Sequence, residues 1–248
     1  MIEVWSQKTS TNSRLYDALA NFENLSLKLC SMSNSLQRML ISAVITFSLL
    51  FLLSPCALVS SSNAVYSVES QEEGKQNIAL TFDDGPHGTL TPMLLNSLKG
   101  LNAKVTFFVM GIKVAKHELI LKRAAAEGHE IANHVWNHPV LTKITYDEVY
   151  NQLMTTNEAI RSVLNVAPSI MRPPYGNTNG KLNDFIQNKG NLSVIMWSLD
   201  TLDWKRPNPQ KIVDLVLTKA KAGDIILCHD IHPGTIQVSE DKDLRNIH

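Results

Sequence analysis

The sequence predicts an α/β fold in which parallel strands are joined by amphipathic helices. From residue 78 onward, short apolar runs alternate with segments of helical periodicity, a pattern typical of strands linked by crossover helices. Polar motifs follow the ends of these runs, and active sites form at the carboxyl ends of strands in barrel-like α/β folds. The candidate strands are 78–82, 105–109, 129–133, 170–172, 192–197 and 225–228, and the candidate helices are 92–99, 114–127, 146–164, 181–188 and 208–222.

One N-terminal segment has the composition of a membrane-crossing helix. Residues 39–59 contain no charged side chain and are long enough to cross a bilayer. Lys28 and Arg38 precede this segment and Glu69 follows it, which predicts that the basic side stays in the cytoplasm. We therefore expect an exported protein that acts outside the cytoplasmic membrane, either anchored in the membrane or secreted to the cell envelope.

Two interpretations of this segment remain open. It is either an uncleaved signal anchor or a signal peptide that is read from Met32 and cut after a small residue such as Ala64. Residues 1–38 are then a cytoplasmic tail or an extension from a mis-assigned start codon. Residues 60–76 are polar and predict a linker to a domain at 77–248.

Charge and cysteine content exclude several kinds of site. The chain of 248 residues has 23 basic and 23 acidic side chains, so nothing predicts a nucleic-acid partner. Cys30, Cys56 and Cys228 are too far apart in the sequence for a CxxC metal site. Cys228 is predicted to be a buried strand residue.

The sequence also predicts a metal site. Asp83 and Asp84 end the first apolar run, and because side chains alternate across a strand, one carboxylate can hold a cation while the other faces what the cation activates. His134 and His138 are spaced so that a tight loop or a helical turn directs both imidazoles to the same side. With Asp84 they make a three-ligand site that leaves a position open for water and substrate. Zinc is the default ion, and cobalt or nickel fits the same ligands.

Five motifs along the chain carry a family resemblance. They are Thr-Phe-Asp-Asp-Gly-Pro-His at 81–87, His-Val-Trp-Asn-His-Pro at 134–139, Arg-Pro-Pro-Tyr-Gly at 172–176, Asp-Thr-Leu-Asp-Trp at 200–204 and Leu-Cys-His at 227–229. In this order they resemble the motifs of the polysaccharide deacetylase family, also called the NodB homology domain or carbohydrate esterase family 4. The resemblance runs from Ile78 to Pro233.

The resemblance implies a distorted (β/α) barrel of seven strands, whereas the sequence offers six candidates. Residues 237–244 have no apolar period. We therefore expect a C-terminally truncated domain that lacks its last helix and strand and leaves the edges of its first and last strands unpaired.

The resemblance also assigns roles to the metal ligands and to a base. It gives the metal to Asp84, His134 and His138. Asp83 is the candidate base that takes a proton from the attacking water. Arg172 is expected to orient Asp83 through a charge-assisted hydrogen bond.

Further roles concern the oxyanion and the leaving group. The backbone N–H of Tyr175 is the expected oxyanion donor. His229 is the expected acid, and Asp200 is expected to raise its pKa and fix its tautomer. Asp203 is given a structural hydrogen-bonding role. Two positions resemble those that line the pocket for the acetyl methyl group, although each could equally be plain core: Trp204 and Leu227.

One position departs from the family pattern. Val135 follows His134 where the family usually has serine or threonine. Valine keeps the shape of threonine without the hydroxyl, so we expect a supporting hydrogen bond to be lost and metal affinity to fall modestly. Among the unassigned histidines, His87 and His232 are expected at the rim of the site, and His117 and His129 in solvent.

These residues predict a metal-dependent hydrolase that removes N-acetyl groups from an N-acetylglucosamine polymer such as peptidoglycan or chitin. An O-acetyl esterase of the acetyl-xylan type is the first alternative, and no residue separates the two. The second alternative is an inactive, membrane-tethered glycan-binding fragment. The complete set of metal ligands, base and acid favours an enzyme, because a binding module needs no proton-transfer groups. The expected partners are the acetylated amino-sugar polymer and, if the N-terminal helix is uncleaved, the membrane.

Overall fold

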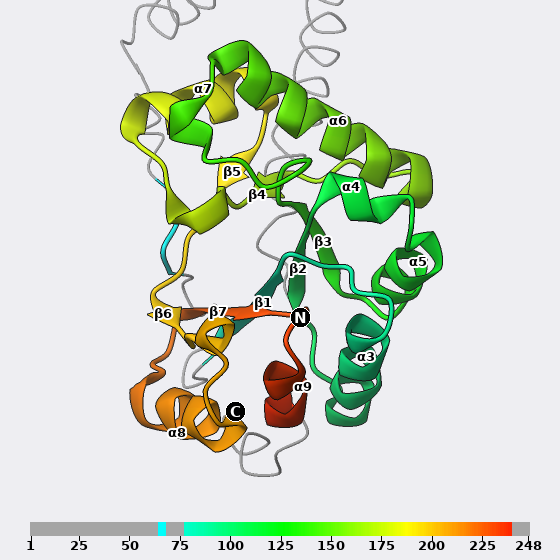
Figure 1. The fold of residues 1–248 in the computed structure, drawn as a ribbon, viewed down its shortest axis with the longest axis vertical. Helices are drawn as coiled ribbons and strands as arrows, with labels where there is room; N and C mark the ends of the chain where they lie inside the picture. The colour runs from blue at the N-terminus through cyan, green and yellow to red at the C-terminus, as the bar shows by residue number, and fades with distance from the viewer. Residues whose placement is uncertain (1–63, 68–76, 240–248) are drawn as a thin grey trace, which may run out of the picture. The chain divides into compact units, whose positions relative to one another are not determined.

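The computed structural model describes residues 64–67 and 77–239 of the chain (Figure 1). Contacts divide the chain into residues 1–60 and 61–248, and every element below belongs to the second unit. The hydrophobic segment at 39–59 lies outside the described residues. No helix within the two described ranges is long and apolar enough to cross a membrane.

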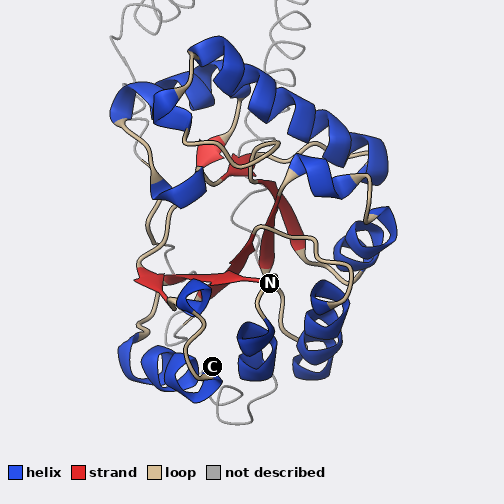
Figure 2. Ribbon diagram, viewed as in Figure 1, coloured by secondary structure: helices blue, strands red, loops and turns tan. Residues whose placement is uncertain are grey.

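Seven parallel strands form one curled sheet, which confirms the predicted barrel-like α/β fold (Figure 2). The order across the sheet is β5-β4-β3-β2-β1-β7-β6. The strands are β1 (Ala79–Asp83), β2 (Thr106–Val109), β3 (Glu130–Asn133), β4 (Ile170–Met171), β5 (Ser193–Val194), β6 (Leu199–Asp200) and β7 (Ile225–His229).

Helices lie around the outside of this sheet (Figure 2). They are α3 (Leu90–Leu101), α4 (Gly111–Val114), α5 (Glu118–Ala126), α6 (Tyr146–Leu164), α7 (Gly180–Gly190), α8 (Pro209–Lys219) and α9 (Pro233–Ser239), with 3₁₀ turns η1 (Leu141–Lys143), η2 (Pro174–Gly176) and η3 (Asp203–Lys205). Local signals set several helix ends. Thr145 and Glu148 form a capping box that begins α6, and Asn165 ends the same helix in the left-handed conformation.

The prediction of six strands was wrong because the run at 192–197 does not form one strand. Its start forms β5, which pairs with β4 at one edge of the sheet. The chain then continues to β6, which pairs with β7 at the opposite edge. β6 has only two residues, too few to produce a readable alternation of apolar and polar side chains.

The expectation that the first and last strands have unpaired edges was also wrong. β1 and β7 pair with each other, from Ala79 opposite Ile225 to Asp83 opposite His229. Both strands therefore lie inside the sheet, and its edges are β5 and β6. The segment after β7, where we expected no element, begins with α9, whose Ile236 is buried in the main core cluster.

Alternation along the strands separates two apolar layers. Phe82 of β1 and Cys228 of β7 belong to a cluster that also contains α3 residues such as Leu94, as predicted for a buried Cys228. Ala79 and Ile225 belong to a second cluster inside the curl of the sheet. The side chains two and four positions further along β1 and β7 face the same inner side, so both strands direct their last residues into the mouth of the barrel.

Candidate active site and metal centre

The three predicted metal ligands converge at the ends of β1 and β3. Asp84 Oδ1 lies 3.3 Å from the Nε2 atoms of both His134 and His138. The three candidate ligand atoms all lie within 4.8 Å of one another. Asp84 Oδ1 is buried and forms no hydrogen bond to any described residue, although two imidazole nitrogens face it. A buried carboxylate oxygen and two nitrogens directed at one point fit a divalent cation.

Charge at this site favours the ionised form of Asp84. Burial alone would raise the pKa of Asp84, but the nearby imidazoles of His134 and His138 outweigh it. They hold the pKa of Asp84 well below its ordinary value. Burial and the nearby His134 lower the pKa of His138, so its imidazole is neutral and available as a ligand at neutral pH.

A backbone contact fixes the tautomer of His134. Its Nδ1 lies 2.9 Å from the carbonyl oxygen of Arg172, which can only accept a hydrogen bond. Nδ1 therefore carries the hydrogen, and the lone pair of Nε2 is directed toward Asp84. Arg172, which directly follows β4, thus orients the candidate metal ligand that directly follows the neighbouring strand β3.

The segment from His134 to His138 is a loop held from two sides. His138 and Val135 have positive φ angles of 65° and 57°. The Val135 carbonyl accepts a hydrogen bond from Gly111 N at 2.9 Å, and the Val135 N–H donates to the Asn133 side chain at 2.7 Å. These bonds fix a backbone conformation that a β-branched residue rarely adopts.

Val135 itself packs away from solvent. It is completely buried among apolar side chains that include Leu153 and Met171. His134 has its Nδ1 partner in the Arg172 carbonyl, so the ring is oriented without a hydroxyl at position 135. The expected fall in metal affinity stays a prediction.

Asp83 is held by a completely buried arginine. Arg172 Nη1 donates to Asp83 Oδ1 at 2.8 Å and to Thr81 Oγ1 at 2.7 Å. The guanidinium lies 4.1 Å from the centre of the Phe108 ring. Asp83 Oδ2 is 3.9 Å from His134 Nε2, so the carboxylate presents its second oxygen toward the metal ligands. This arrangement gives Asp83 the orientation expected of a proton acceptor.

His229 is paired with Asp203 and not with Asp200. Its Nδ1 lies 2.7 Å from Asp203 Oδ1, and its backbone N–H donates to Asp203 Oδ2 at 2.7 Å. Asp200 instead accepts hydrogen bonds from Leu202 N at 2.8 Å and from the Trp204 indole N–H at 3.4 Å. The expected pairing was wrong because Asp200 turns its carboxylate into its own loop, while η3 brings Asp203 against β7.

The buried pair favours the protonated form of His229. Burial lowers the pKa of His229, but the hydrogen bond and charge of Asp203 outweigh it and raise the pKa to about 9. Asp203 also accepts from Thr235 Oγ1 at 2.6 Å. Burial opposes ionisation of Asp203, yet the bonds from His229 and Thr235 lower its pKa. An imidazolium at neutral pH is a suitable proton donor.

The predicted oxyanion donor and the two predicted pocket residues lie at different depths. Tyr175 is 67% exposed, has a φ of 60° and places its ring centroid 4.5 Å from that of His138. Trp204 is 49% exposed, so it is not plain core. Leu227 is buried in β7, two residues before His229. Tyr175 therefore lies at the surface beside His138, and Trp204 is half-exposed in η3.

Sequence reasoning missed two residues that support the Asp83–Asp84 turn. Lys113 donates to the backbone carbonyl of Asp84 at 2.7 Å. Asp230 is completely buried, accepts a hydrogen bond from Thr91 Oγ1 at 2.5 Å, and lies so close to Gly85 that a Cβ there would overlap its carboxylate. Burial raises the pKa of Asp230 to about 7. Neither Lys113 nor Asp230 had a predicted partner, and no sequence spacing indicates these contacts.

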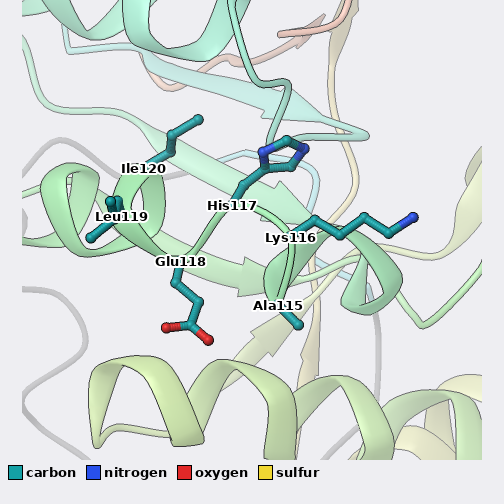
Figure 3. A pocket seen from close by; sticks show the side chains of 6 residues that line it. All are labelled: Ala115, Lys116, His117, Glu118, Leu119 and Ile120. Atoms are coloured by element: carbon teal, nitrogen blue, oxygen red, sulfur yellow. The ribbon is translucent and has the colours of Figure 1, made fainter.

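The burial of the remaining histidines differs in part from the prediction. His232 lies beside His229, with ring centroids 5.8 Å apart. His129 was expected in solvent but is buried, because it meets the Phe107 ring edge-on and accepts a hydrogen bond from Val105 N. His117 is partly buried in a shallow pocket that contains none of the predicted site residues (Figure 3). That pocket is lined by Ala115, Lys116, His117, Glu118, Leu119 and Ile120.

Comparisons with known proteins agree with this geometry. A family model described as polysaccharide deacetylase matches residues 70–193. The peptidoglycan-N-acetylglucosamine deacetylase PgdA of Listeria monocytogenes is 43% identical over 175 residues, which cover 71% of this chain but only 36% of the Listeria protein. A chitooligosaccharide deacetylase of Bradyrhizobium is 40% identical over 163 residues, covering 64% of this chain and 73% of that protein. The solved structure of the peptidoglycan deacetylase PdaC of Bacillus subtilis matches with a TM-score of 0.66 and 36% identity, covering 70% of this chain and 85% of that one.

Proposed function

Because this chain belongs to the polysaccharide deacetylase family, we propose that it is a metal-dependent hydrolase that removes N-acetyl groups from a polymer containing N-acetylglucosamine. The observation that carries the proposal is the arrangement of two charge pairs around one group of ligands. Arg172 holds Asp83 on one side of the metal ligands, and Asp203 holds His229 at the end of the neighbouring strand. A glycan-binding surface has no need of this arrangement.

The metal would be held by Asp84, His134 and His138, and zinc, cobalt or nickel suits these ligands. When bound there, such an ion supplies Lewis acidity and lowers the pKa of water. Side chains of this protein carry out the proton transfers. Asp83 accepts the proton of the attacking water through its second carboxylate oxygen, while Arg172 keeps the carboxylate in place.

The oxyanion and the leaving amine need donors on the other side of the site. The Tyr175 backbone N–H is the proposed oxyanion donor. His229 donates a proton to the leaving nitrogen from Nε2, because its Nδ1 is engaged by Asp203. Trp204 and Leu227 are the proposed walls of the pocket for the acetyl methyl group.

The proposed substrates are peptidoglycan and chitin-like oligosaccharides, and the proposed place of action is outside the cytoplasmic membrane. Both rest on the named activities of the relatives and on the apolar segment at 39–59. Whether the protein reaches the envelope is measured by cell fractionation and by protease digestion of intact cells. Recovery of all the protein in a protease-protected cytoplasmic fraction would contradict the proposed location.

The test of function is acetate release by the full chain from chitooligosaccharides, peptidoglycan and acetyl-xylan. We expect release from the N-acetylated substrates that EDTA abolishes and added zinc or cobalt restores. Asp83→Asn should lower turnover by at least about 100-fold while glycan affinity stays, because only the proton acceptor is lost. Asp214→Asn, on the exposed face of α8, is the control and should be unchanged.

Two other results of the acetate-release assay would support the alternative functions. Release from acetyl-xylan alone would identify an O-acetyl esterase on the same scaffold. Glycan binding without acetate release, in a protein that binds zinc, would identify a binding protein and refute the proposed activity.

A further inference from the structure

A short segment far from the motifs pairs with the chain next to Arg172. This segment, residues 64–67, is called the strap here and is cyan in Figure 1. Val65 forms a parallel bridge with Ile195: its N–H donates to the Val194 carbonyl at 2.9 Å, and its carbonyl accepts from Met196 N at 2.7 Å. Ser67 forms an antiparallel bridge near the start of β7. The strap thus covers the edge of the sheet at β5.

The chain that the strap binds also binds the guanidinium. The Ile195 carbonyl accepts from Arg172 Nε at 3.2 Å, and the Met196 carbonyl accepts from Arg172 Nη2 at 2.9 Å. The guanidinium also donates hydrogen bonds to Thr81 and Asp83. Two of these four guanidinium hydrogen bonds therefore depend on the position of Ile195 and Met196, the residues that pair with the strap.

Val65 also packs against the apolar side chains that lie beneath the guanidinium of Arg172. It contacts the inner apolar cluster that contains Phe108 and Ile195, and Arg172 lies over the Phe108 ring. Arg172 is 0% exposed, so water cannot replace a carbonyl that moves away. An unsatisfied buried cation is costly, and the arginine would shift to find new partners.

We propose that the strap is a positioning element of the active site, in which Val65 acts through Ile195, Met196 and Arg172 to hold Asp83. The inference rests on the proposed function for its effect on turnover, whereas its effect on Arg172 is independent of that function. It gives the stretch just after the apolar N-terminal segment a role in the chemistry. Cleavage after Ala64 would keep Val65, and cleavage beyond residue 67 would remove the whole strap.

The first test compares Val65→Asp with Tyr66→Asp in the full chain. Val65 is packed inward, whereas its neighbour Tyr66 is 53% exposed, so the same charge at position 66 is a matched control. Val65→Asp should lower kcat by about 10- to 100-fold, because small displacements of catalytic groups cost that much. KM and zinc affinity should change little, Tyr66→Asp should behave as the unmodified protein, and Val65→Ile should retain activity.

The second test reads Arg172 directly and needs no activity. The ¹⁵N NMR signal of its Nε–H should exchange with solvent at least about tenfold faster in Val65→Asp than in the unmodified protein or in Tyr66→Asp. If Val65→Asp does not fold, Val65→Ala takes its place with a smaller effect of the same sign. Retained kcat in the folded variant, or unchanged protection of the Arg172 Nε–H, would overturn the inference even if the melting temperature falls. If the unmodified protein releases no acetate, the proposed function fails and the NMR comparison alone decides the strap.

Discussion

Replacing Asp203 by asparagine should remove the main cause of the raised pKa of His229. The carboxylate accepts hydrogen bonds from His229 Nδ1, His229 N and Thr235 Oγ1. Asparagine keeps the shape and loses the charge. Burial lowers the pKa of His229, and only the charges of Asp83 and Asp84 would still raise it, so we expect the imidazole of Asp203→Asn to titrate well below 9.

The expected change in stability follows from the raised pKa of His229. A rise from 6.5 to about 9 corresponds to about 3 kcal/mol in favour of the imidazolium in the folded protein. Because the folded-state pKa lies above the unfolded one, this stabilisation is fully present below pH 6.5 and is lost as the pH rises through about 9. The free energy of unfolding of the two proteins should therefore differ most near pH 6 and approach a smaller, constant difference above pH 9.

The assay is an NMR titration of the His229 ring, together with urea unfolding at several pH values. EDTA is present throughout, because a cation held near Asp84 would itself disfavour the imidazolium. Asp200→Asn is the matched control and should leave the His229 pKa unchanged, since Asp200 bonds its own loop. The reasoning is refuted if His229 of the unmodified protein titrates near 6.5, or if Asp200→Asn and not Asp203→Asn lowers its pKa.

Two further predictions concern the ligands and the turn that carries Asp84. His138→Ala removes one of three converging candidate ligands, so zinc affinity measured by calorimetry should fall by at least about 100-fold. That fall exceeds the usual cost of losing a residue that only supports a ligand. His232→Ala is the control and should bind zinc normally; tight zinc binding by His138→Ala would show that the ion binds elsewhere. Gly85→Ala places a methyl group on the buried Asp230 carboxylate and should lower the free energy of unfolding by about 2–3 kcal/mol in urea. Gly180→Ala has open space around its new methyl group and should cost nothing, and equal stability of both variants would contradict the close approach of Asp230.

The sequence was sufficient to predict, to within one residue, where β1, β2, β3, β4 and β7 end. The strand ends place Asp83, His134, Arg172 and His229 at one face, because alternation along parallel strands directs them to the same side. The helix predicted at 146–164 has those bounds in the structure, since Thr145 and Glu148 mark its start. The five motifs identified the family, to which the chain belongs.

The sequence failed where a contact depends on the path of a short segment. Asp200 and Asp203 lie in the same motif with the same charge, and only the turn η3 decides which of them reaches His229. β6 was missed because two residues carry no period. The bridge between Val65 and Ile195 joins segments that share no local signal, so only the assembled fold reveals it.

The pairing of β1 with β7 has a consequence for the order of folding. Strands β4, β3, β2 and β1 are neighbours in the sheet and follow one another along the chain, so Asp84, His134 and His138 can be gathered by local steps. The contact from Thr81 to Ile226 instead joins residues 145 positions apart. Contacts of such long range form slowly, because a long loop must close first. During refolding, Asp84, His134 and His138 should therefore come together before His229 reaches Asp83, so that a cation can be captured before His229 is in place.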